Sequence, residues 1–313
     1  MPALHQALVL TAGLGTRLRP LTSVRAKPAI PVAGEALVRR IITWLAANGV
    51  ADLVLNLHHL PDTLTAQVGD GSDLSARVRY SWEQPAILGS AGGPRQALAI
   101  LDAATFLIVN GDTLTDLDLA PLAAAHAASG ALVTLALVPN VEPHRYGGVR
   151  LDADGAVVGF VARGPAAAGS HHFIGVQVVS ADVFRGVPAG QAASSIGGVY
   201  DELIAIRPGR VRGYSCEAAF WDVGTTSDYV KTSNAFVADP AEVMLGRRVR
   251  IDRSARVSRS ILWDDIDVGP ECTLTGCIVT DRVIVPARST YRDAVLIASA
   301  DGEVVAHPLR SGN

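Results

Sequence analysis

The sequence predicts an α/β fold in which helices flank a mixed, Rossmann-like sheet, followed by a short C-terminal β-helix. In roughly the first hundred residues, short apolar runs alternate with longer amphipathic stretches, which is typical of strands joined by helical crossovers. Strand-like runs of mixed pattern follow, and beyond Glu242 the apolar residues recur about every six positions. We therefore expect two domains, residues 1–240 and residues 241–313.

The first part of the chain is expected to form a parallel arrangement of strands. The expected strands are residues 7–10, 53–57, 78–82 and 106–109. An amphipathic helix is expected over residues 37–48 and ends at Gly49, and a second helix is expected to open at Gly92, Gly93 and Pro94 and to run to Leu101. Ligands of such sheets bind beyond the carboxyl ends of the strands, so the segments after Leu10, Trp82 and Val109 should meet in one crevice.

The remainder of the first domain is read from shorter signals. Strands are expected at residues 132–138, 157–161 and 173–179, and Asp152 to Gly155 indicate a hairpin turn. A helix over residues 227–238 should end before Pro240.

The last part of the chain shows a degenerate repeat. Ile251 to Val257 and Val268 to Leu274 keep a six-residue step, whereas other apolar positions do not. A step near six predicts coils of a parallel β-helix, in which each short strand stacks on the strand one coil earlier. The alternative for so short a segment is a small antiparallel hairpin cap.

Composition and charge restrict the class of protein. Of the 313 residues, 49% are hydrophobic and 18% are charged, which is typical of a compact enzyme rather than a disordered chain. The net charge of -3 provides no broad basic field, which argues against nucleic acid as a partner. Three cysteines, with no Cys-x-x-Cys pair, favour neither a disulfide framework nor a zinc site. The apolar run of residues 7–11 is too short for a signal peptide or a membrane span, so we expect a cytoplasmic enzyme.

The strongest motif is a glycine-rich turn directly after the first strand. Gly13 and Gly15 allow tight turns in which several N–H groups point at phosphate oxygens, and Arg17 adds a cation. A dinucleotide-binding motif would require glycine where Leu18 stands, and Pro20 prevents a smooth helix. Farther on, Ala26-Lys27-Pro28 places a lysine next to a ring of fixed φ, which favours a defined direction for its ammonium group.

Two carboxylates from distant segments are candidate magnesium ligands. Asp112 follows an apolar strand in Asn110-Gly111-Asp112, and Asp222 lies at the end of an apolar run before a helix. Together with a triphosphate they provide the hard oxygen ligands that Mg²⁺ takes while it keeps several waters. The pairs His58-His59 and His171-His172 are less suitable, because adjacent residues of a strand face opposite sides.

These motifs occur in the order Gly13 to Leu18, Pro20 to Thr22 and Lys27-Pro28, followed by Leu88 to Gly92, Asn110 to Asp112, Tyr146-Gly147 and Trp221 to Gly224. The series resembles the signature of the nucleotide-sugar pyrophosphorylases, which are sugar-1-phosphate nucleotidyltransferases. The resemblance covers residues 7–237 and implies the nucleotide-diphospho-sugar transferase type of α/β fold. The degenerate repeat is similar to the left-handed β-helical tail of the mannose-1-phosphate guanylyltransferase branch.

The resemblance implies a role for particular residues. Arg17, Lys27 and Asp112 would be catalytic, Asp112 and Asp222 would hold Mg²⁺, and Gln84 and Gly89 would bind the base. The nucleotide would also contact the glycine turn, namely Ala12, Gly13, Leu14, Gly15 and Thr16. Gly147, Arg163 and Gly175 would border the sugar phosphate. Many relatives carry Glu-Lys-Pro where this chain has Ala162-Arg163-Gly164, which leaves the identity of the sugar open.

The implied reaction joins a nucleoside triphosphate to a sugar-1-phosphate and releases pyrophosphate. GTP with mannose-1-phosphate or a similar hexose- or heptose-1-phosphate is the leading expectation, and UTP or dTTP is the alternative. A second alternative is a regulatory paralogue that senses a nucleotide sugar without making it. The C-terminal segment is expected to serve self-association into a homo-oligomer.

Overall fold

The computed structural model describes residues 4–240 and 242–309, which form two compact units. The first unit comprises the described residues of Met1–Gly13, Ile41–His59 and Val68–Phe220. The second comprises those of Leu14–Arg40, Leu60–Gln67 and Trp221–Asn313. The division expected at residue 240 rests on a change of sequence pattern, whereas the two compact units are defined by contacts in the structure. The segments Leu14–Arg40 and Leu60–Gln67 belong to the unit that contains the C-terminal part of the chain. One of the unit boundaries falls inside the glycine turn, between Gly13 and Leu14.

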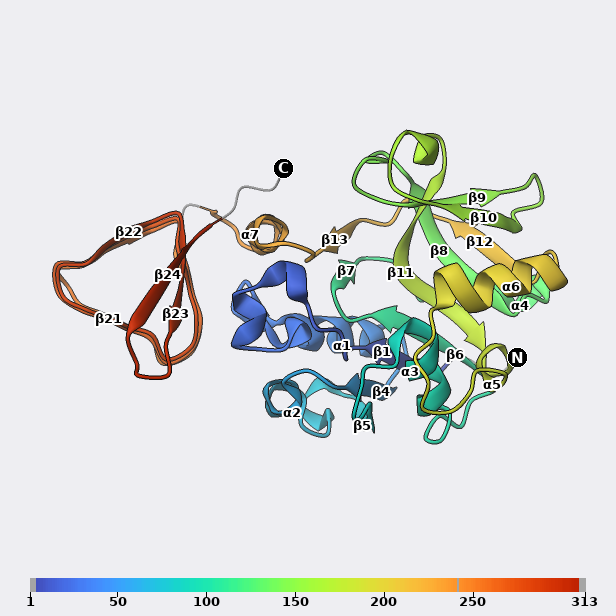
Figure 1. The fold of residues 1–313 in the computed structure, drawn as a ribbon, viewed down its shortest axis with the longest axis horizontal. Helices are drawn as coiled ribbons and strands as arrows, with labels where there is room; N and C mark the ends of the chain where they lie inside the picture. The colour runs from blue at the N-terminus through green and yellow to red at the C-terminus, as the bar shows by residue number, and fades with distance from the viewer. Residues whose placement is uncertain (1–3, 241, 310–313) are drawn as a thin grey trace. The chain divides into compact units, whose positions relative to one another are not determined.

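A nine-stranded mixed sheet forms the centre of the first unit (Figure 1). Its longest path runs in the order β10-β9-β11-β6-β1-β4-β5, and β8 joins β11 to β12. The strands are β1 (Gln6–Leu10), β4 (Asp52–Leu57), β5 (Arg77–Trp82), β6 (Thr105–Asn110), β8 (Val133–Pro139), β9 (Gly148–Leu151), β10 (Val157–Val161), β11 (His171–Ser180) and β12 (Val211–Ser215). All the strands expected from the sequence of this unit are present.

The parallel part of this sheet positions the ends of three strands. β1 pairs in parallel with both β4 and β6, and Leu10 lies opposite Asn110. These strands are almost completely apolar because they are buried on both faces, with Leu8 and Phe106 fully buried. As expected from the sequence, the segments that follow Leu10 and Val109 therefore begin at the same edge of the sheet.

The helices of the α/β part agree with expectation in one case and differ in another. α1 (Leu37–Ala47) is the first expected helix, and Gly49 follows it with φ +79°. The second helix, α3, spans Gly89–Ala97 rather than running to Leu101, so the expected extent was wrong. Its first turn is fixed by tertiary contacts, since the N–H groups of Ala91 and Gly92 donate to the carbonyl of Ala193.

Further short elements complete the units. They are α4 (Leu119–Ser129), α5 (Asp182–Arg185), α6 (Tyr200–Ile206) and β7 (Thr113–Thr115), with α2 (Pro61–Val68), β2 (Pro31–Val32), β3 (Glu35–Ala36), β13 (Phe220–Asp222) and α7 (Thr226–Ala235). α7 begins with a capping box formed by Thr225 and Asp228, and it ends three residues earlier than the sequence suggested. The expected hairpin turn is also present, because the Asp152 carboxylate accepts hydrogen bonds from the N–H groups of Asp154 and Ala156.

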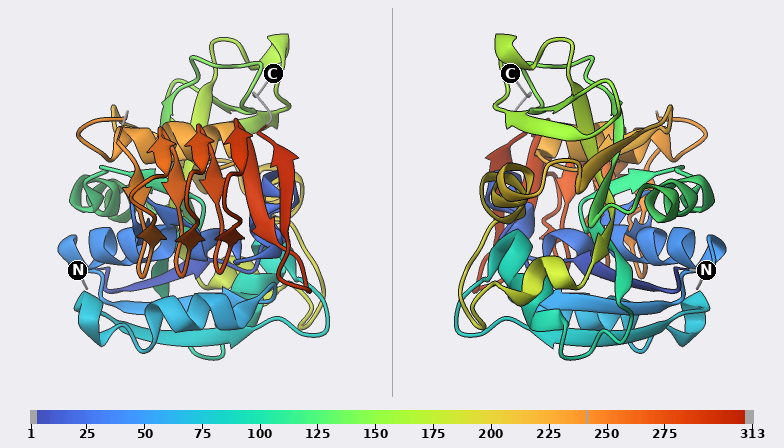
Figure 2. Two further views of the ribbon diagram at one scale, coloured as in Figure 1. Left: turned by 90° about the vertical axis from the view of Figure 1, so that its left-hand side faces the viewer. Right: turned by 90° about the vertical axis from the view of Figure 1, so that its right-hand side faces the viewer.

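The C-terminal part of the second unit is a left-handed β-helix of parallel strands, stacked in rows in Figure 2. Met244, Ile261 and Ile278 lie at equivalent positions of successive coils, 17 residues apart. Within the first coil, strands begin at Met244, at Arg250 six residues later, and at Arg256 after another six residues. The next coil begins at Ile261, only five residues after Arg256. The one short side explains why the six-residue repeat looks degenerate in the sequence. The strands are β14 (Met244–Leu245), β15 (Arg250–Ile251), β16 (Arg256–Ser258), β17 (Ile261–Leu262), β18 (Asp267–Val268), β19 (Thr273–Thr275), β20 (Ile278–Val279), β21 (Ile284–Val285) and β22 (Thr290–Arg292).

A hairpin closes one side of the β-helix. β23 (Ala294–Ala298) stacks in parallel on β20, and β24 (Val304–Pro308) pairs with β23 in the antiparallel direction. The alternative of an antiparallel cap is therefore correct only for this last pair. The interior is apolar, with Leu262, Val268 and Leu274 almost completely buried.

The segment Leu14–Arg40 is attached to the β-helix by a buried arginine. Arg25 forms ion pairs with Asp264 at 2.8 Å and with Asp281 at 2.6 Å, and its side chain is 7% exposed. The guanidinium also lies over the ring of Trp263, 5.3 Å from its centre. The indole N–H of Trp263 donates to the hydroxyl of Tyr229, which in turn donates to the carbonyl of Pro31.

These ion pairs predict a stability that depends on pH. Burial opposes ionisation of Asp264, but hydrogen bonds from Arg247 and Arg25 outweigh it and hold its pKa below the ordinary aspartate value of 3.8. Because the pKa of Asp264 is lowered in the folded state, the stabilisation is fully present above the ordinary pKa of 3.8. It is lost as the pH falls from there through the lowered pKa of the folded state. We expect urea unfolding to show this loss in acid and a shallower pH dependence in Asp264→Asn; equal slopes would contradict it.

No helix in the described parts of the chain has the length and apolar character needed to cross a membrane.

Candidate active site

Asp112 is held at the carboxyl edge of the first unit's sheet. The N–H of Gly111 donates to the carbonyl of Leu10 at 3.0 Å, and a Cβ atom on Gly111 would lie 2.5 Å from the same oxygen. Only glycine allows this approach, which fixes the turn that carries the half-buried Asp112 next to the end of β1. The hydroxyl of Thr113 donates to Asp112 Oδ1 at 3.3 Å.

A buried pair of side chains that sequence reasoning did not identify, Asn56 and Glu83, lies behind the first residues of the glycine turn. Asn56 Oδ1 accepts hydrogen bonds from the N–H groups of Thr11, at 2.6 Å, and Ala12, at 3.3 Å. Asn56 Nδ2 donates to Glu83 Oε1 at 2.7 Å, and Glu83 Oε2 accepts from the N–H of Leu88 at 2.6 Å. The start of the turn is thereby connected to the segment that precedes Gly89. The backbone N–H of Ala12 is already used inside the protein, so Ala12 can contact a nucleotide only in another way.

Gly93 provides the space for this buried carboxylate. A Cβ atom on Gly93 would lie 2.4 Å from Glu83 Oε1 and 3.0 Å from Asn56 Nδ2. We expect Gly93→Ala to displace the pair and to lower the free energy of unfolding by about 1–3 kcal/mol, measured in urea. Gly186→Ala is the matched control, because nothing lies within 4 Å of a Cβ there. Equal stabilities of the two variants would contradict this role of Gly93.

The residues expected to bind the base lie at the two ends of the loop that follows Glu83. Gln84 and Gly89 are both exposed. Gly89 has φ +75°, and a Cβ atom would lie 2.8 Å from the carbonyl of Ala193, so no side chain fits there. Since Glu83 bonds to Leu88, the loop of residues 84–87 is closed at its base by a single buried carboxylate.

The residues expected to border the sugar phosphate lie at two places in the first unit. Gly175 has φ +82° at an irregular point of β11, and a Cβ atom would lie 2.8 Å from Asn110 Nδ2, next to the Asp112 turn. Gly147 packs against the segment of Arg163, since a Cβ atom there would lie 3.0 Å from the carbonyl of Val161 and 3.8 Å from the N of Arg163. The Arg163 side chain is exposed.

Aromatic residues lie beside Gly147. The ring of His172 stacks on Tyr146 with centres 4.1 Å apart, and Phe220 contacts both rings. Burial, and to a lesser degree the charge of Arg145, lowers the pKa of His172 to about 4, while a hydrogen bond with the Gly147 backbone opposes the shift. The imidazole is therefore neutral near pH 7 and acts as a packing residue of this aromatic group.

The second unit carries the other part of the glycine turn. Gly15 has φ +59°, and the Thr22 hydroxyl donates to its carbonyl at 2.9 Å. A Cβ atom on Gly15 would lie 2.7 Å from Thr22 Cγ2 and 3.2 Å from Lys27 Cβ, so this glycine lets the turn pack on the buried Lys27. Leu14, Thr16 and Arg17 are exposed around it.

Arg17 and Asp222 come together in the second unit. A Cβ atom on Gly224 would lie 3.0 Å from Asp222 Oδ2 and 3.6 Å from Arg17 Nη1. The absence of a side chain at Gly224 therefore leaves room beside both charged groups. The expected site residues are divided between the two units. The second unit contains Leu14, Gly15, Thr16, Arg17, Lys27 and Asp222, and the first contains Ala12, Gly13, Gln84, Gly89, Asp112, Gly147, Arg163 and Gly175.

Asp112 and Asp222 suit a magnesium ion that keeps waters and substrate phosphates as ligands, rather than a metal ion whose ligands all come from the protein. Within residues 4–240 and 242–309, no three His, Cys, Asp or Glu side chains gather as a metal-binding group. Asp112 and Asp222 offer hard carboxylate oxygens, and Mg²⁺ commonly takes one or two such ligands together with waters and substrate phosphates. Cys216, Cys272 and Cys277 are free thiols.

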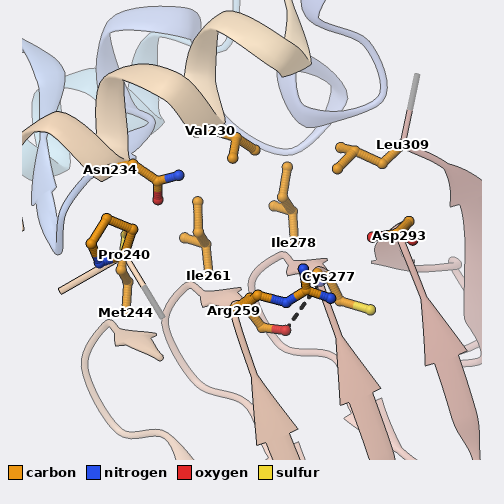
Figure 3. A pocket seen from close by; sticks show the side chains of 12 residues that line it. Val230, Asn234, Pro240, Met244, Arg259, Ile261, Cys277, Ile278, Asp293 and Leu309 are labelled. Atoms are coloured by element: carbon orange, nitrogen blue, oxygen red, sulfur yellow. Dashed lines mark hydrogen bonds between the residues drawn. The ribbon is translucent and has the colours of Figure 1, made fainter. Parts of the chain in front are cut away.

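A cavity of about 370 Å³ in the second unit is separate from these residues. It lies between α7 and the β-helix and is lined by Val230, Asn234, Ile261, Ile278 and Asp293 among others (Figure 3). None of the residues expected to bind substrate contributes to it.

Two family models match overlapping parts of the chain. The family model described as "Nucleotidyl transferase" matches residues 6–238, and the model "GlmU-like, C-terminal hexapeptide" matches residues 228–291. The first match includes every residue expected to bind a substrate or a metal. The second includes most of the β-helix.

Curated relatives and solved structures extend these matches. A mannose-1-phosphate guanylyltransferase of Mycobacterium tuberculosis is 32% identical over 91% of this chain and 83% of its own length. An N-acetylmuramate alpha-1-phosphate uridylyltransferase of Neisseria meningitidis is 34% identical over 70% of this chain and 93% of its own length. The crystal structure of HddC from Yersinia pseudotuberculosis is similar with a TM-score of 0.65 at 22% identity, covering 75% of this chain and all of that one, which supports the fold.

Proposed function

The chain belongs to the nucleotidyl transferase family and is a sugar-1-phosphate nucleotidyltransferase, and from this premise we propose that it joins GTP to mannose-1-phosphate or a similar hexose- or heptose-1-phosphate. The observation that carries the choice of substrates is the similarity to the mannose-1-phosphate guanylyltransferase, which extends over 91% of this chain and thus includes residues of the β-helix. The N-acetylmuramate alpha-1-phosphate uridylyltransferase covers only 70% of the chain, and a UTP–glucose-1-phosphate uridylyltransferase of Synechocystis covers 85% of it at a lower identity of 27%.

In the proposed reaction a phosphate oxygen of the sugar-1-phosphate attacks the α-phosphorus of the triphosphate in line. The bond between the α-phosphorus and the bridging oxygen breaks, and pyrophosphate leaves with that oxygen. The attacking group is already an anion, so alignment and charge neutralisation replace a strong general base. Arg17 would stabilise the departing pyrophosphate, and Lys27 would balance charge on the phosphates as it shifts.

The proposal assigns Asp112 and Asp222 to one magnesium ion. Bound there, the ion would neutralise phosphate charge and hold the triphosphate for attack. Their carboxylates fit this role by their chemistry, and Gly111 and Gly224 keep the backbone beside them free of side chains. Gln84 and Gly89 would contact the base, together with the turn of residues 12–16. Arg163 would grip the sugar phosphate, because its planar fork suits phosphate at least as well as the lysine of many relatives.

Release of pyrophosphate tests the proposed substrates. Five nucleoside triphosphates would be combined with mannose-, glucose- and heptose-1-phosphate in the presence of Mg²⁺. We expect the highest kcat/KM with GTP and mannose-1-phosphate or the heptose compound. Preference for UTP or dTTP would refute the guanylyl assignment, and binding of a nucleotide sugar without pyrophosphate release by any pair would indicate a regulatory paralogue.

We also propose that the β-helix serves self-association. The hexapeptide model that matches residues 228–291 supports a separate role for this segment. Sedimentation of the full chain should show an oligomer, whereas a chain that ends at Asp239 should sediment as a monomer. Survival of the oligomer in the shortened chain would refute this role.

A further inference from the structure

The loop that carries Lys27 is built around the side chain of Arg25. Its turns are closed by hydrogen bonds from the N–H of Arg25 to the carbonyl of Leu21 and from the N–H of Ala29 to that of Ala26. The guanidinium of Arg25 also reaches across Lys27, because its Nη1 donates to the carbonyl of Ala29 at 3.4 Å. One arginine therefore contacts the loop on both sides of the lysine.

The same guanidinium binds two carboxylates of the β-helix. Nε and Nη2 donate to the two oxygens of Asp281, each at 2.6 Å, and Nη2 also donates to Asp264 at 2.8 Å. Asp264 and Asp281 occupy the same position of successive coils, 17 residues apart, and the backbone N–H of Asp264 donates to Asp281 Oδ1. Stacking places two like charges next to each other in a largely buried place, and a cation between the loop and the coils relieves their repulsion.

We propose that Arg25 is a positioning residue for Lys27, and that the stacked Asp264 and Asp281 of the β-helix are needed for turnover because they hold Arg25. This inference rests on the proposed catalytic role of Lys27. The planar fork of arginine bonds to both carboxylates at once, which a flexible ammonium group cannot do with the same geometry. Lys27 itself is 9% exposed, so a small shift of its loop moves the ammonium group among packed neighbours.

A direct readout of the position of Lys27 is available because the chain has only two lysines, Lys27 and Lys231. In Lys231→Arg, protein grown with lysine labelled with ¹³C at Cε gives one lysine side-chain signal, from Lys27. We expect Arg25→Gln to shift or broaden this signal strongly. Arg248→Gln is the matched control. Arg248 also binds both oxygens of one carboxylate, that of Asp265, which follows Asp264 in the chain, but this ion pair is exposed.

A double-mutant cycle then separates positioning from a general effect on the fold. With the substrate pair that the wild type uses best, we expect Arg25→Gln to lower kcat at least tenfold, with a smaller change of KM, and Arg248→Gln to stay within twofold of the wild type. If Arg25 acts through Lys27, adding Arg25→Gln to Lys27→Met causes little further loss, because the group it positions is already missing. Arg25→Lys should restore only part of the activity.

The outcomes are distinct. Multiplying losses in the double variant, or an unchanged Lys27 signal in Arg25→Gln, would overturn the positioning role while leaving the proposed reaction in place. A wild type that releases no pyrophosphate with any substrate pair would overturn the reaction and the inference with it. Should Arg25→Gln fail to fold, Asp281→Asn replaces it in the spectrum and in the cycle, with the same expected results, because it removes the negative charge and one of the two oxygens that accept hydrogen bonds from Arg25.

Discussion

Asp112→Asn should lower kcat by about a thousandfold while the protein remains folded. The substitution keeps the shape of the side chain and removes the negative charge expected to hold Mg²⁺. Asp112 is half-buried and accepts a hydrogen bond from Thr113, which an amide oxygen can also accept. Pyrophosphate release measured over a range of magnesium concentrations would show the loss, together with a higher concentration of Mg²⁺ for half-maximal activity.

The control for this change is Asp154→Asn, which removes a carboxylate from an exposed hairpin turn of the same unit. It should leave turnover and magnesium dependence unchanged. Thermal unfolding of both variants should match the wild type. Wild-type turnover in Asp112→Asn would remove this residue from the metal site, whereas a collapsed melting transition would assign it a structural role.

Lys27→Met is expected to lower kcat by about a hundredfold or more. Methionine retains most of the length of the buried side chain next to Gly15, so the packing of the turn is kept and the positive charge is lost. The loss should appear mainly in kcat, because the charge is expected to act on the phosphates as they rearrange.

Lys231→Met provides the matched change, since Lys231 is exposed on α7 and is the only other lysine of the chain. Its kcat should equal that of the wild type. A fall in Lys27→Met confined to KM for the triphosphate would contradict a role in the chemical step and indicate binding alone.

Most of the first unit's sheet could be predicted because its strands are simple. A run such as residues 106–109, bounded by polar residues, has few alternatives to a buried parallel strand. The second helix was misjudged because Gly92, Gly93 and Pro94 have low helix propensity, and the contacts with Ala193 that hold α3 come from more than a hundred residues away in the chain. The β-helix was recognised from its spacing, but the 17-residue coil was not, since one short side masks the period.

The motif residues of the site were visible in the sequence because glycines and charged residues cluster at strand ends. Asn56 and Glu83 were missed, since a polar residue inside an apolar strand and an acid after another strand give no signal of a mutual contact. A polar side chain at the otherwise apolar end of residues 53–57 was the one available indication. Arg25 was likewise undetectable, because its partners lie 239 and 256 residues farther along the chain.

The constant 17-residue step between Asp264 and Asp281 limits where this chain can gain or lose residues. One residue added between the two acids would turn the second carboxylate away from Arg25, whereas additions in the exposed hairpin turn of residues 299–302 would leave both acids in place. Insertions should therefore be tolerated after Asp281 and not before it, and only the duplication of an entire coil between the acids could keep two carboxylates in contact with Arg25.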